Sequence, residues 1–368
     1  MNSKVRAVRQ ILRGALHGSP SRLCDHRSWR SEHPHTWRTA VEAEVLTRRA
    51  PIRFGSREAG FGESVDNAMP ELGVLILSNA RILGPDGWLV TEDGSLLYES
   101  TWYGSSFSRH PRSIAYGRAL PLSGTCLSLA SDFAGGNYGH FLLDCLGRLA
   151  LFQKSGLSFE NVDHVYLPRP TSHTAAKFVH SRLGIPMHKC VWADQGDVQA
   201  DLVIGTSFPG LRRNYAPWLT NFFRAQVSTS PLRHHRRVYV PRKGQRKVTN
   251  EEELMPALKR FGFHIYDFDD VEDEAAFFSE CSIVVGPHGA GLTNLVFCSP
   301  GTKVLELIPS DHVHPYYYTI ATSADAEYSY IVGQSKGTRP QGTFGPSPFD
   351  FEVAPDIFEH ALETICRQ

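Results

Sequence analysis

The stretch Ile283-Val-Val-Gly-Pro-His-Gly-Ala-Gly-Leu-Thr-Asn-Leu-Val-Phe297 decides the fold of this chain. It predicts an apolar strand that enters a glycine-punctuated turn, followed by a helix that begins near Ala290. A second apolar strand within residues 301–309 follows, and it carries a single carboxylate at Glu306. Strand, turn, helix and strand in this order are typical of a unit that binds a phosphate and a sugar hydroxyl at the end of a sheet.

The turn itself has the chemistry of an anion site. Gly286, Gly289 and Gly291 permit positive φ and close approach to the backbone. The free N–H groups and the positive end of the following helix would then face the anion. The spacing differs from the Gly-x-Gly-x-x-Gly of dinucleotide folds, so a tight turn without a ligand fits the pattern equally well. The imidazole of His288 inside the turn favours the ligand site.

Length and charge limit the classes of protein that fit. The chain has 368 residues, 41% of them apolar and 21% charged, which is ordinary for a globular protein with room for roughly two domains. Lys plus Arg and Asp plus Glu both total 38. Because this balance leaves no strong basic field over the chain, a nucleic acid polymer is not expected as a partner.

The cysteines and apolar runs indicate where the protein works. Seven cysteines are scattered without a Cys-x-x-Cys pair, and several lie in apolar runs, as buried reduced thiols do. The N-terminus lacks an apolar core of signal-peptide length, and no run approaches the roughly 20 residues that span a bilayer. We therefore expect a cytoplasmic protein. Basic residues outnumber acidic ones in residues 1–50. This segment could contact the inner face of a membrane peripherally, and a frayed N-terminus is the alternative.

The order of apolar runs indicates an α/β fold in two parts. Residues 1–70 have few periodic patterns and predict a poorly ordered basic arm. Short runs between 73 and 98, separated by turn residues, predict β-hairpins. Strands then alternate with helices over a domain at 71–230 and, after a Ser/Pro-rich linker, over a second domain at 231–368, which indicates mostly parallel sheets. The predicted helices span 138–154, 174–183, 251–260, 271–281 and a closing helix at 354–365.

The helix predicted at 138–154 places three polar side chains on one face. His140, Asp144 and Arg148 follow one another at intervals of four residues, which aligns them along the helix. Such a column can pass a proton and hold an anion, although a ladder of stabilising side-chain pairs gives the same pattern. The glycine-rich run at 134–139 creates a turn at the start of the helix, which favours a site.

A basic loop follows the strand predicted at 237–240. Arg242, Lys243, Arg246 and Lys247 lie at the carboxyl end of this strand, where open α/β sheets bind their ligands. Arginine suits forked contact with phosphate. A solvated basic loop is the alternative, because surface Lys and Arg are common. The adjacent Asn250-Glu-Glu-Glu is read as a helix N-cap with first-turn acids.

Two further clusters could bind a metal, and neither pattern favours it. Asp267 and Asp269 form an Asp-x-Asp pair within a run of acids, which an acidic helix start explains more simply. His312 and His314 have no further ligand at a diagnostic spacing. We therefore expect no metal.

Taken together, these motifs resemble glycosyltransferase family 61. The chain carries Gly-His-Phe-Leu-Leu-Asp at 139–144, Tyr-Val-Pro-Arg-Lys at 239–243, Asn-Glu-Glu-Glu at 250–253 and Gly-Pro-His-Gly-Ala-Gly with Val-Leu-Glu-Leu at 286–307. They stand in the family's order, and the resemblance covers roughly 70–330. Phe141 replaces the tryptophan that family members commonly have after the histidine, which keeps an aromatic ring. Without a Golgi anchor like that of the eukaryotic branch, the chain looks closer to the bacterial capsular polysaccharide type.

The resemblance implies a GT-B-like architecture, in which two Rossmann-like domains face a cleft. It implies an inverting glycosyltransferase that moves a sugar from a nucleotide-sugar donor, preferably a UDP-sugar, to a hydroxyl of a glycan or lipid-linked glycan, without a metal or other cofactor. Asp144 or His140 would be the base and Arg148 would support it. Glu306 would meet the ribose, and His288 the diphosphate or the sugar. The full donor-binding set would be Arg242, Arg246, His288, Gly289, Ala290, Gly291, Thr293, Asn294 and Glu306.

Two other functions fit the same architecture. A nucleotide-sugar epimerase or hydrolase would process the donor without an acceptor. A catalytically silent protein would only bind nucleotide or glycan, and the complete set of polar residues argues against it.

Overall fold

The structure, a computed structural model, describes residues 18–61, 65, 67–107, 114–227, 235–268, 270–340 and 345–367. The chain forms two compact units. Unit 1 comprises Met1–Val45 and Ala68–Arg212, and unit 2 comprises Leu46–Asn67 and Arg213–Gln368. Both are α/β structures, as the sequence predicts. The division falls at 212/213 instead of near 230, and most of the segment expected to be the linker lies outside the described residues.

Unit 1 is built on a mixed sheet with the strand order β1-β8-β7-β6-β12-β9-β10-β11 and with β2 paired to β6. The predicted β-hairpins are confirmed, because β6 (Leu72–Leu83), β7 (Trp88–Val90) and β8 (Ser95–Leu97) pair antiparallel. The strands β9, β10, β11 and β12 form the parallel part. The remaining strands are β1 (Arg22–Cys24), β2 (Trp37–Val41), β9 (Leu120–Ser128), β10 (His164–Leu167), β11 (Cys190–Trp192) and β12 (Val198–Thr206).

The helix predicted at 138–154 is confirmed, with a change of geometry in its middle. It consists of α5 (Tyr138–His140), the π-helix η3 (Phe141–Leu146) and α6 (Gly147–Lys154). In the π-helix the N–H of Gly147 donates to the carbonyl of Leu142, five residues earlier. Insertions of this kind occur mostly at functional sites. The other helices are α2 (His26–Glu32), α4 (Trp102–Phe107), α7 (His173–Lys177) and η5 (Phe178–Arg182).

The N-terminal segment corrects the prediction of a poorly ordered arm at 1–70. Residues 1–17 lie outside the described part, but 22–54 hold α2 and short strands that include β3 (Glu44–Val45) and β4 (Ile52–Phe54). Trp29 is buried, and its indole N–H donates to Thr36 at 3.0 Å. These short elements are stabilised by packing on other segments, so they leave no periodic pattern in the sequence. The strand β5 (Ala68–Met69) pairs with β3, and β4 joins the sheet of unit 2.

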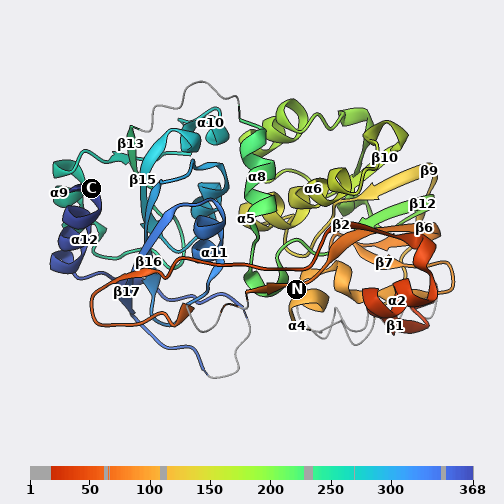
Figure 1. The fold of residues 1–368 in the computed structure, drawn as a ribbon, viewed down its shortest axis with the longest axis horizontal. Coiled ribbons are helices and arrows are strands. Elements are labelled where there is room, and N and C mark those ends of the chain that lie inside the picture. Colours follow the sequence, from red (N-terminus) through yellow and green to blue (C-terminus); the bar gives the residue numbers. More distant parts are fainter. Residues whose placement is uncertain are drawn as a thin grey trace. The chain divides into compact units, whose positions relative to one another are not determined.

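Unit 2 is a doubly wound sheet with the order β14-β13-β15-β16-β17-β18, and β4 lies beside β17. All of its pairs are parallel except the pair formed by β18. Helices cover both faces, with α9 and α12 on one side and α10 and α11 on the other (Figure 1). The strands are β13 (Arg236–Tyr239), β14 (His264–Ile265), β15 (Cys281–Pro287), β16 (Lys303–Pro309), β17 (Glu327–Ser335) and β18 (Phe351–Glu352).

Two of the predicted helices of unit 2 differ from the expectation, and α8 and α11 were not predicted. The helix after the glycine turn is a 3₁₀-helix, η9 (Ala290–Phe297), and the helix expected at 271–281 is shortened to α10 (Glu274–Ser279). The carboxylate of Asp273 caps α10 by accepting from the N–H of Ala276 at 3.1 Å. The closing helix is confirmed as α12. The other helices are α8 (Pro217–Ala225), α9 (Glu251–Arg260), α11 (Tyr316–Ser323) and α12 (Pro355–Arg367).

Of the two properties that glycine permits in this turn, the structure uses close approach and not positive φ. Gly286, Gly289 and Gly291 all lie outside the positive-φ region, and Gly289 is extended with φ 176°. Glycine is required there because other groups approach closely. A Cβ on Gly286 would lie 2.8 Å from the carbonyl oxygen of Val240, and one on Gly289 would collide with the guanidinium of Arg242.

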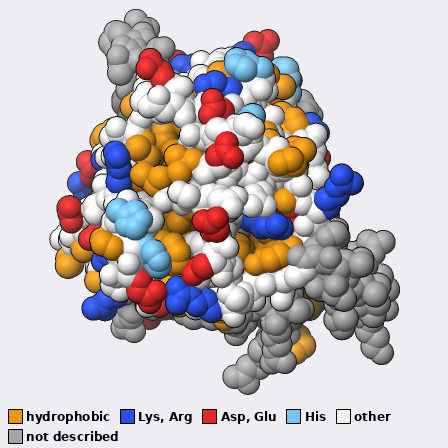
Figure 2. Space-filling model, turned by 90° about the vertical axis from the view of Figure 1, so that its right-hand side faces the viewer, with side chains coloured by type: hydrophobic (Ala, Val, Ile, Leu, Met, Phe, Trp, Pro, Cys, Tyr) orange, Lys and Arg blue, Asp and Glu red, His pale blue; other side chains and the backbone are white. Residues whose placement is uncertain are grey.

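Charged side chains of both signs are interspersed on the face of the molecule drawn in Figure 2, in agreement with the equal numbers of acids and bases. All seven cysteines are free, and five of them are buried. Within the described residues, no helix is both long and apolar enough to cross a membrane.

Arg48 attaches the segment 46–67 to the rest of unit 2. Its guanidinium is partly buried and donates to acceptors on α11 and on the residues before α8. These acceptors are the carbonyl of Thr319 at 3.0 Å, Thr322 Oγ1 at 2.7 Å, Ser323 Oγ at 3.0 Å, Asn214 Oδ1 at 2.6 Å and the carbonyl of Tyr215 at 2.7 Å. The neighbouring Arg49 instead forms an ion pair with Asp325 in which both side chains are mostly exposed.

This contrast predicts the effect of two adjacent substitutions. Arg48→Lys should lower the free energy of unfolding by about 2 kcal/mol, because one ammonium cannot serve five acceptors in a forked arrangement. Arg49→Lys should change it by less than about 0.5 kcal/mol, since exposed ion pairs contribute little. Denaturant unfolding of the two variants measures both values. Equal losses would show that Arg48 does not hold the segment.

Candidate functional site

The predicted functional residues gather in two places, one in each unit. In unit 1, His140 and Asp144 are joined by a hydrogen bond of 2.6 Å between Nδ1 of the ring and a carboxylate oxygen. The side chain of Asp144 is fully buried, whereas that of His140 is 19% exposed. Asn137 fixes the start of the helix, because its side chain accepts from the N–H groups of Gly139 and His140. The histidine is therefore the accessible member of the pair, and Asp144 orients it.

Arg148, the third member of the column, has a structural environment. It is 2% exposed, and it donates to the carbonyls of Asp144, Ser100 and Thr206. Burial lowers the pKa of its guanidinium. These bonds fix the helix against its neighbours and leave the guanidinium no role in holding an anion.

In unit 2, three side chains on neighbouring strands form a buried chain of hydrogen bonds. His288 follows β15, Glu306 lies in β16 and Tyr328 lies in β17. One oxygen of Glu306 is 2.5 Å from Nδ1 of His288, and the other accepts from the hydroxyl of Tyr328. Glu306 is fully buried. Because both of its oxygens are occupied, we assign Glu306 to holding His288 in place instead of meeting a ribose.

The burial of this chain decides where its proton lies. Removal from water raises the pKa of Glu306 to about 8, so the carboxyl is protonated at neutral pH. Burial, followed by the charges of Arg246, Arg242 and Arg213, holds the pKa of His288 well below its usual range. The neutral carboxyl then donates to Nδ1 of the neutral ring. In this tautomer Nε2 of His288 carries the hydrogen.

His312 and His314 lie beside His288 in the same protonation state. The ring centroids of His288 and His312 are 5.2 Å apart, and those of His312 and His314 are 4.3 Å apart. Nδ1 of His312 accepts from the N–H of Ser347 at 3.4 Å, and Nδ1 of His314 accepts from the guanidinium of Arg213 at 2.6 Å. Burial lowers the pKa of both rings. Both are therefore neutral, with the hydrogen on Nε2.

All three histidines thus present Nε2–H as a donor. In the part of the chain that the structure describes, no protein group forms a hydrogen bond with any of these three Nε2 atoms. Donors gathered without acceptors are the complement of a ligand that carries acceptors, such as a phosphate group.

Arginines surround this donor cluster. Four arginines have charges that lower the pKa of a histidine of the cluster or of Arg246. They are Arg213, Arg242, Arg246 and Arg339. Burial and the charge of Arg242 lower the pKa of Arg246 to about 10, so its charged form is less stable here than in water, although the residue stays charged at neutral pH. Arg213 and Arg246 also have positive φ angles of 66° and 61°. Non-glycine residues in this region store backbone strain, which is common at functional sites.

The site lies where open α/β sheets place their ligands. Arg242 and Arg246 follow β13, His288 follows β15, and the residues His312 and His314 follow β16, so all come from the carboxyl ends of parallel strands. The expectation of an anion site at these strand ends agrees with this arrangement. The sequence missed Tyr328, Arg213 and Tyr317 altogether.

The remaining donor-binding candidates differ in how far they are exposed to solvent. Gly289 lies against Arg242, because a Cβ on Gly289 would collide with the guanidinium. Ala290 and Gly291, at the start of η9, are partly exposed. Thr293 is 1% exposed, and Asn294 is fully buried. Their contact with a ligand stays a prediction.

Only one of the two acidic candidates for metal binding lies in the described part of the chain. Asp267 is exposed and lies 3.8 Å from the ammonium of Lys243, whereas Asp269 lies outside the described residues. Among the residues that the structure describes, no three His, Cys, Asp or Glu side chains are placed to hold a metal ion.

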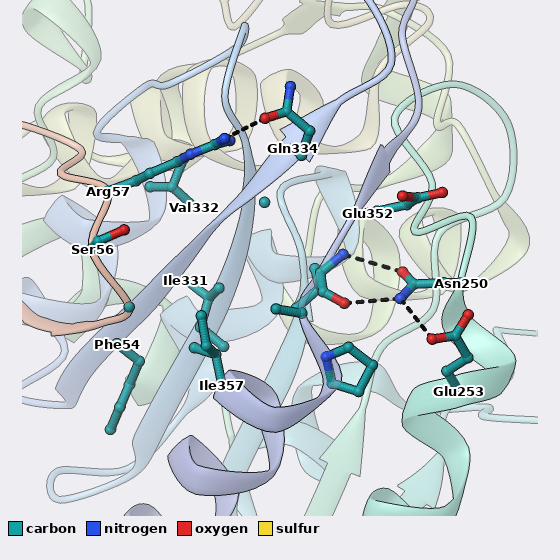
Figure 3. A pocket seen from close by; sticks show the side chains of 15 residues that line it. Phe54, Ser56, Arg57, Asn250, Glu253, Ile331, Val332, Gln334, Glu352 and Ile357 are labelled. Atoms are coloured by element: carbon teal, nitrogen blue, oxygen red, sulfur yellow. Dashed lines mark hydrogen bonds between the residues drawn. The ribbon is translucent and has the colours of Figure 1, made fainter.

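A separate pocket of about 480 Å³ opens elsewhere in unit 2, beside β17 and the start of α12 (Figure 3). It contains none of the predicted site residues. Its Asn250 donates to the carbonyl of Val353 at 2.9 Å and accepts from the N–H of the same residue at 3.1 Å. Asn250 therefore links two segments instead of capping α9 with its side chain, as the sequence suggested.

A family model matches a part of the chain that holds His140 and Asp144 of unit 1 and His288 of unit 2. Residues 138–305 match the family model described as Glycosyltransferase 61. Beta-1,2-xylosyltransferase RCN11 of Oryza sativa subsp. japonica is 30% identical over 99 residues, which are 24% of this chain and 19% of that protein. Protein O-linked-mannose beta-1,4-N-acetylglucosaminyltransferase 2 of Bos taurus is 28% identical over 184 residues, 45% of this chain and 30% of that protein.

A third relative, Xylan glycosyltransferase MUCI21 of Arabidopsis thaliana, is 26% identical over 157 residues, 38% of this chain and 32% of that protein. The matches thus span between about a fifth and a third of these relatives. The matched family region begins at Tyr138, at the helix of His140, and ends at Leu305, next to Glu306. Residues 138–305 therefore resemble glycosyltransferase family 61.

Proposed function

We propose that this protein is an inverting glycosyltransferase that moves a sugar from a nucleotide-sugar donor, preferably a UDP-sugar, to a hydroxyl of a glycan or lipid-linked glycan. In this proposal unit 2 binds the donor, unit 1 binds the acceptor, and the two units work together in a GT-B-like arrangement. The family supports the reaction class. The bacterial capsular type and a cytoplasmic location at the inner face of a membrane belong to the same proposal.

The donor cluster of unit 2 is the observation that carries the proposal. Three neutral histidines with Nε2–H donors, surrounded by arginines, suit the closely spaced oxygens of a diphosphate. As the bond between the sugar and the diphosphate breaks, negative charge develops on the leaving oxygens. Donors that are already in position stabilise this charge more in the transition state than in the donor.

The pair in unit 1 supplies the proton acceptor. Nε2 of His140 takes the proton of the acceptor hydroxyl, whose oxygen attacks the anomeric carbon of the donor sugar. The bond from that carbon to the diphosphate breaks, and the nucleoside diphosphate leaves. Asp144 stabilises the imidazolium through Nδ1. A single displacement of this kind inverts the anomeric configuration.

Nucleotide binding and turnover separate this proposal from its alternatives. Thermal shift with a panel of nucleotide sugars identifies the donor, since a bound ligand stabilises the folded state. Product analysis with that donor follows. Transfer that needs an acceptor supports the proposal, whereas donor turnover without any acceptor indicates a hydrolase or epimerase. Binding without turnover under all conditions indicates a catalytically silent protein.

Arg242→Lys should weaken UDP binding at least tenfold, because the forked contact with phosphate is lost. The change also removes the bond of 2.5 Å from Nε to the carbonyl of Gln245, which orients the guanidinium. The control is Lys243→Gln, since Lys243 is an exposed neighbour. The Kd of the control for UDP should rise by less than a factor of three, although the variant loses a full charge. Calorimetry measures both, and an unchanged Kd for Arg242→Lys would sink this assignment.

UDP binding should weaken as pH rises through about 8. Below this pH the protonated Glu306 donates to His288 and keeps the hydrogen on Nε2. Above it the carboxylate accepts from Nδ1, so Nε2 turns a lone pair towards the phosphate. We expect a loss of about tenfold, ~1.4 kcal/mol, between pH 7 and pH 9.

Glu306→Gln is the control for this pH effect. The amide N–H donates to Nδ1 at every pH, and the amide oxygen still accepts from Tyr328. The variant should therefore bind UDP at pH 7 within threefold of the wild type and lose the decline between pH 7 and pH 9. A decline that persists in the variant would assign the titration to another group.

Transfer should not require a divalent cation, because the arginines and histidines of unit 2 can neutralise the diphosphate. Initial rates should be the same with and without EDTA. Loss of turnover in EDTA and its return with manganese would show that a cation supplies this charge.

His140→Ala should lower kcat at least a hundredfold, about 2.7 kcal/mol in the barrier, because the proton acceptor is removed. Asp144→Asn should also lower kcat, since the imidazolium loses its charged partner. The Kd for UDP should stay within threefold of the wild type in both, because the donor residues lie in unit 2. If neither substitution lowers kcat more than about tenfold, the pair is structural.

A further inference from the structure

Phe133 has a backbone conformation that bulky residues rarely adopt. Its φ is 65°, and its ring is 43% exposed. A left-handed conformation in a non-glycine residue strains the chain, and an exposed apolar ring gains little from the hydrophobic effect. The residue thus combines two unfavourable features, although glycines stand nearby at 135 and 136. Folding alone gives no reason for phenylalanine here.

Its surroundings connect it to the candidate base. The centroid of the Phe133 ring lies 5.2 Å from the ring of His140, 5.6 Å from Trp102 and 5.3 Å from Tyr103. Trp102 also contacts His140, at 6.2 Å between centroids. The partly exposed imidazole therefore lies within an aromatic group, of which Phe133 is the exposed member.

A buried carboxyl group with an unused oxygen adjoins this aromatic group. Asp132 is 2% exposed, and one of its oxygens accepts from the backbone N–H of Trp102 at 2.5 Å. Among the described residues its other oxygen has no hydrogen-bond partner. Burial raises the pKa of Asp132 to about 7. A buried acceptor without a partner is costly, and it marks a position where a hydroxyl group would be stabilised.

We propose that Phe133, supported by Trp102 and Tyr103, is the platform on which a pyranose ring of the acceptor stacks, with a hydroxyl of that ring presented to His140. A sugar ring has C–H faces that pack on an aromatic face and hydroxyl edges that need hydrogen bonds. The exposed ring of Phe133 meets the first requirement, and the partly exposed His140 beside it meets the second. This assignment deepens the proposed function and rests on it for the role of His140.

The occupant follows from this combination of surfaces. A lipid chain would need an apolar surface without a buried carboxyl group, and a flexible peptide hydroxyl has no ring face. The chemical class is therefore a pyranoside with an unbroken C–H face. The strained backbone agrees with a binding role, because strain is retained where function requires the side chain.

The test measures sugar binding to the full-length protein without a donor. Saturation-transfer NMR with methyl β-D-glucopyranoside and methyl β-D-xylopyranoside reports on ring stacking, and xylitol is the probe that has hydroxyls but no ring face. We expect saturation on the C–H protons of both pyranosides and none on xylitol. Phe133→Ala should lower the signal at least fivefold, and Phe133→Trp should retain it. The control is Phe159→Ala, a partly exposed ring of unit 1 that contacts Phe152 instead.

Phe133→Gly separates binding from folding. Glycine accepts positive φ without strain, so this variant should melt at a temperature at least as high as Phe133→Ala, which loses the same ring contacts, while sugar binding is lost in both. A lower melting temperature in Phe133→Gly than in Phe133→Ala, or unchanged sugar signals in Phe133→Ala, would overturn the proposal. UDP binding, measured separately, tests the proposed function. Sugar binding that depends on Phe133 without any nucleotide binding would leave this site standing and sink the transferase.

Discussion

The site of unit 2 depends on a hydrogen bond between two buried groups that are both neutral, His288 and Glu306. A carboxylate and an imidazolium in this position would carry the cost of removing two charges from water, whereas the neutral pair avoids it. The hydroxyl of Tyr328 satisfies the second oxygen of the carboxyl group. Because Nδ1 of His288 is occupied from inside the protein, the opposite edge of the ring is left as a donor. The same logic applies to His312 and His314, whose Nδ1 atoms accept from Ser347 and Arg213.

This arrangement concentrates positive potential without charging the histidines. The arginines supply the net charge, and burial, followed by the nearby charges, keeps the pKa of the imidazoles low and the rings neutral. The cost appears as the lowered pKa of Arg246 and as backbone strain at Arg213 and Arg246. An anion would relieve the repulsion, so the energy of the empty site favours binding. Phe133 in unit 1 has the same kind of strain, and three of the five non-glycine residues with positive φ in the described chain belong to the two candidate sites.

The sequence predicted those parts of the fold that local patterns determine. The helix α9 at Glu251–Arg260 begins and ends as expected, because apolar periodicity and flanking turn residues define it. The segment before residue 70 was misjudged, since its short elements are stabilised by distant segments. The glycines of the turn were recognised, but the groups that approach them, Val240 and Arg242, could not be predicted because their closeness depends on the tertiary structure.

The candidate site was predicted in the same uneven way. His140 and Asp144 share a helix, so their spacing indicated the contact that the structure contains. Glu306 was expected to meet a ligand, because a lone carboxylate on an apolar strand looks functional. Its partner Tyr328 lies on the next strand, and no local pattern connects the two. The sequence suggested only a metal-binding role for His312 and His314. Their role as donors depends on which ring nitrogen carries the hydrogen, and the residues that decide this, Ser347 and Arg213, are distant in sequence.

The tautomers of His288, His312 and His314 are the central claim, and long-range ¹H–¹⁵N NMR correlation spectra of histidine-labelled protein at pH 7 measure them directly. The account predicts neutral rings with the hydrogen on Nε2 for all three, and a change of the His288 pattern as pH rises through about 8. An imidazolium pattern at any of them, or the hydrogen on Nδ1 of His288 at pH 7, would contradict it.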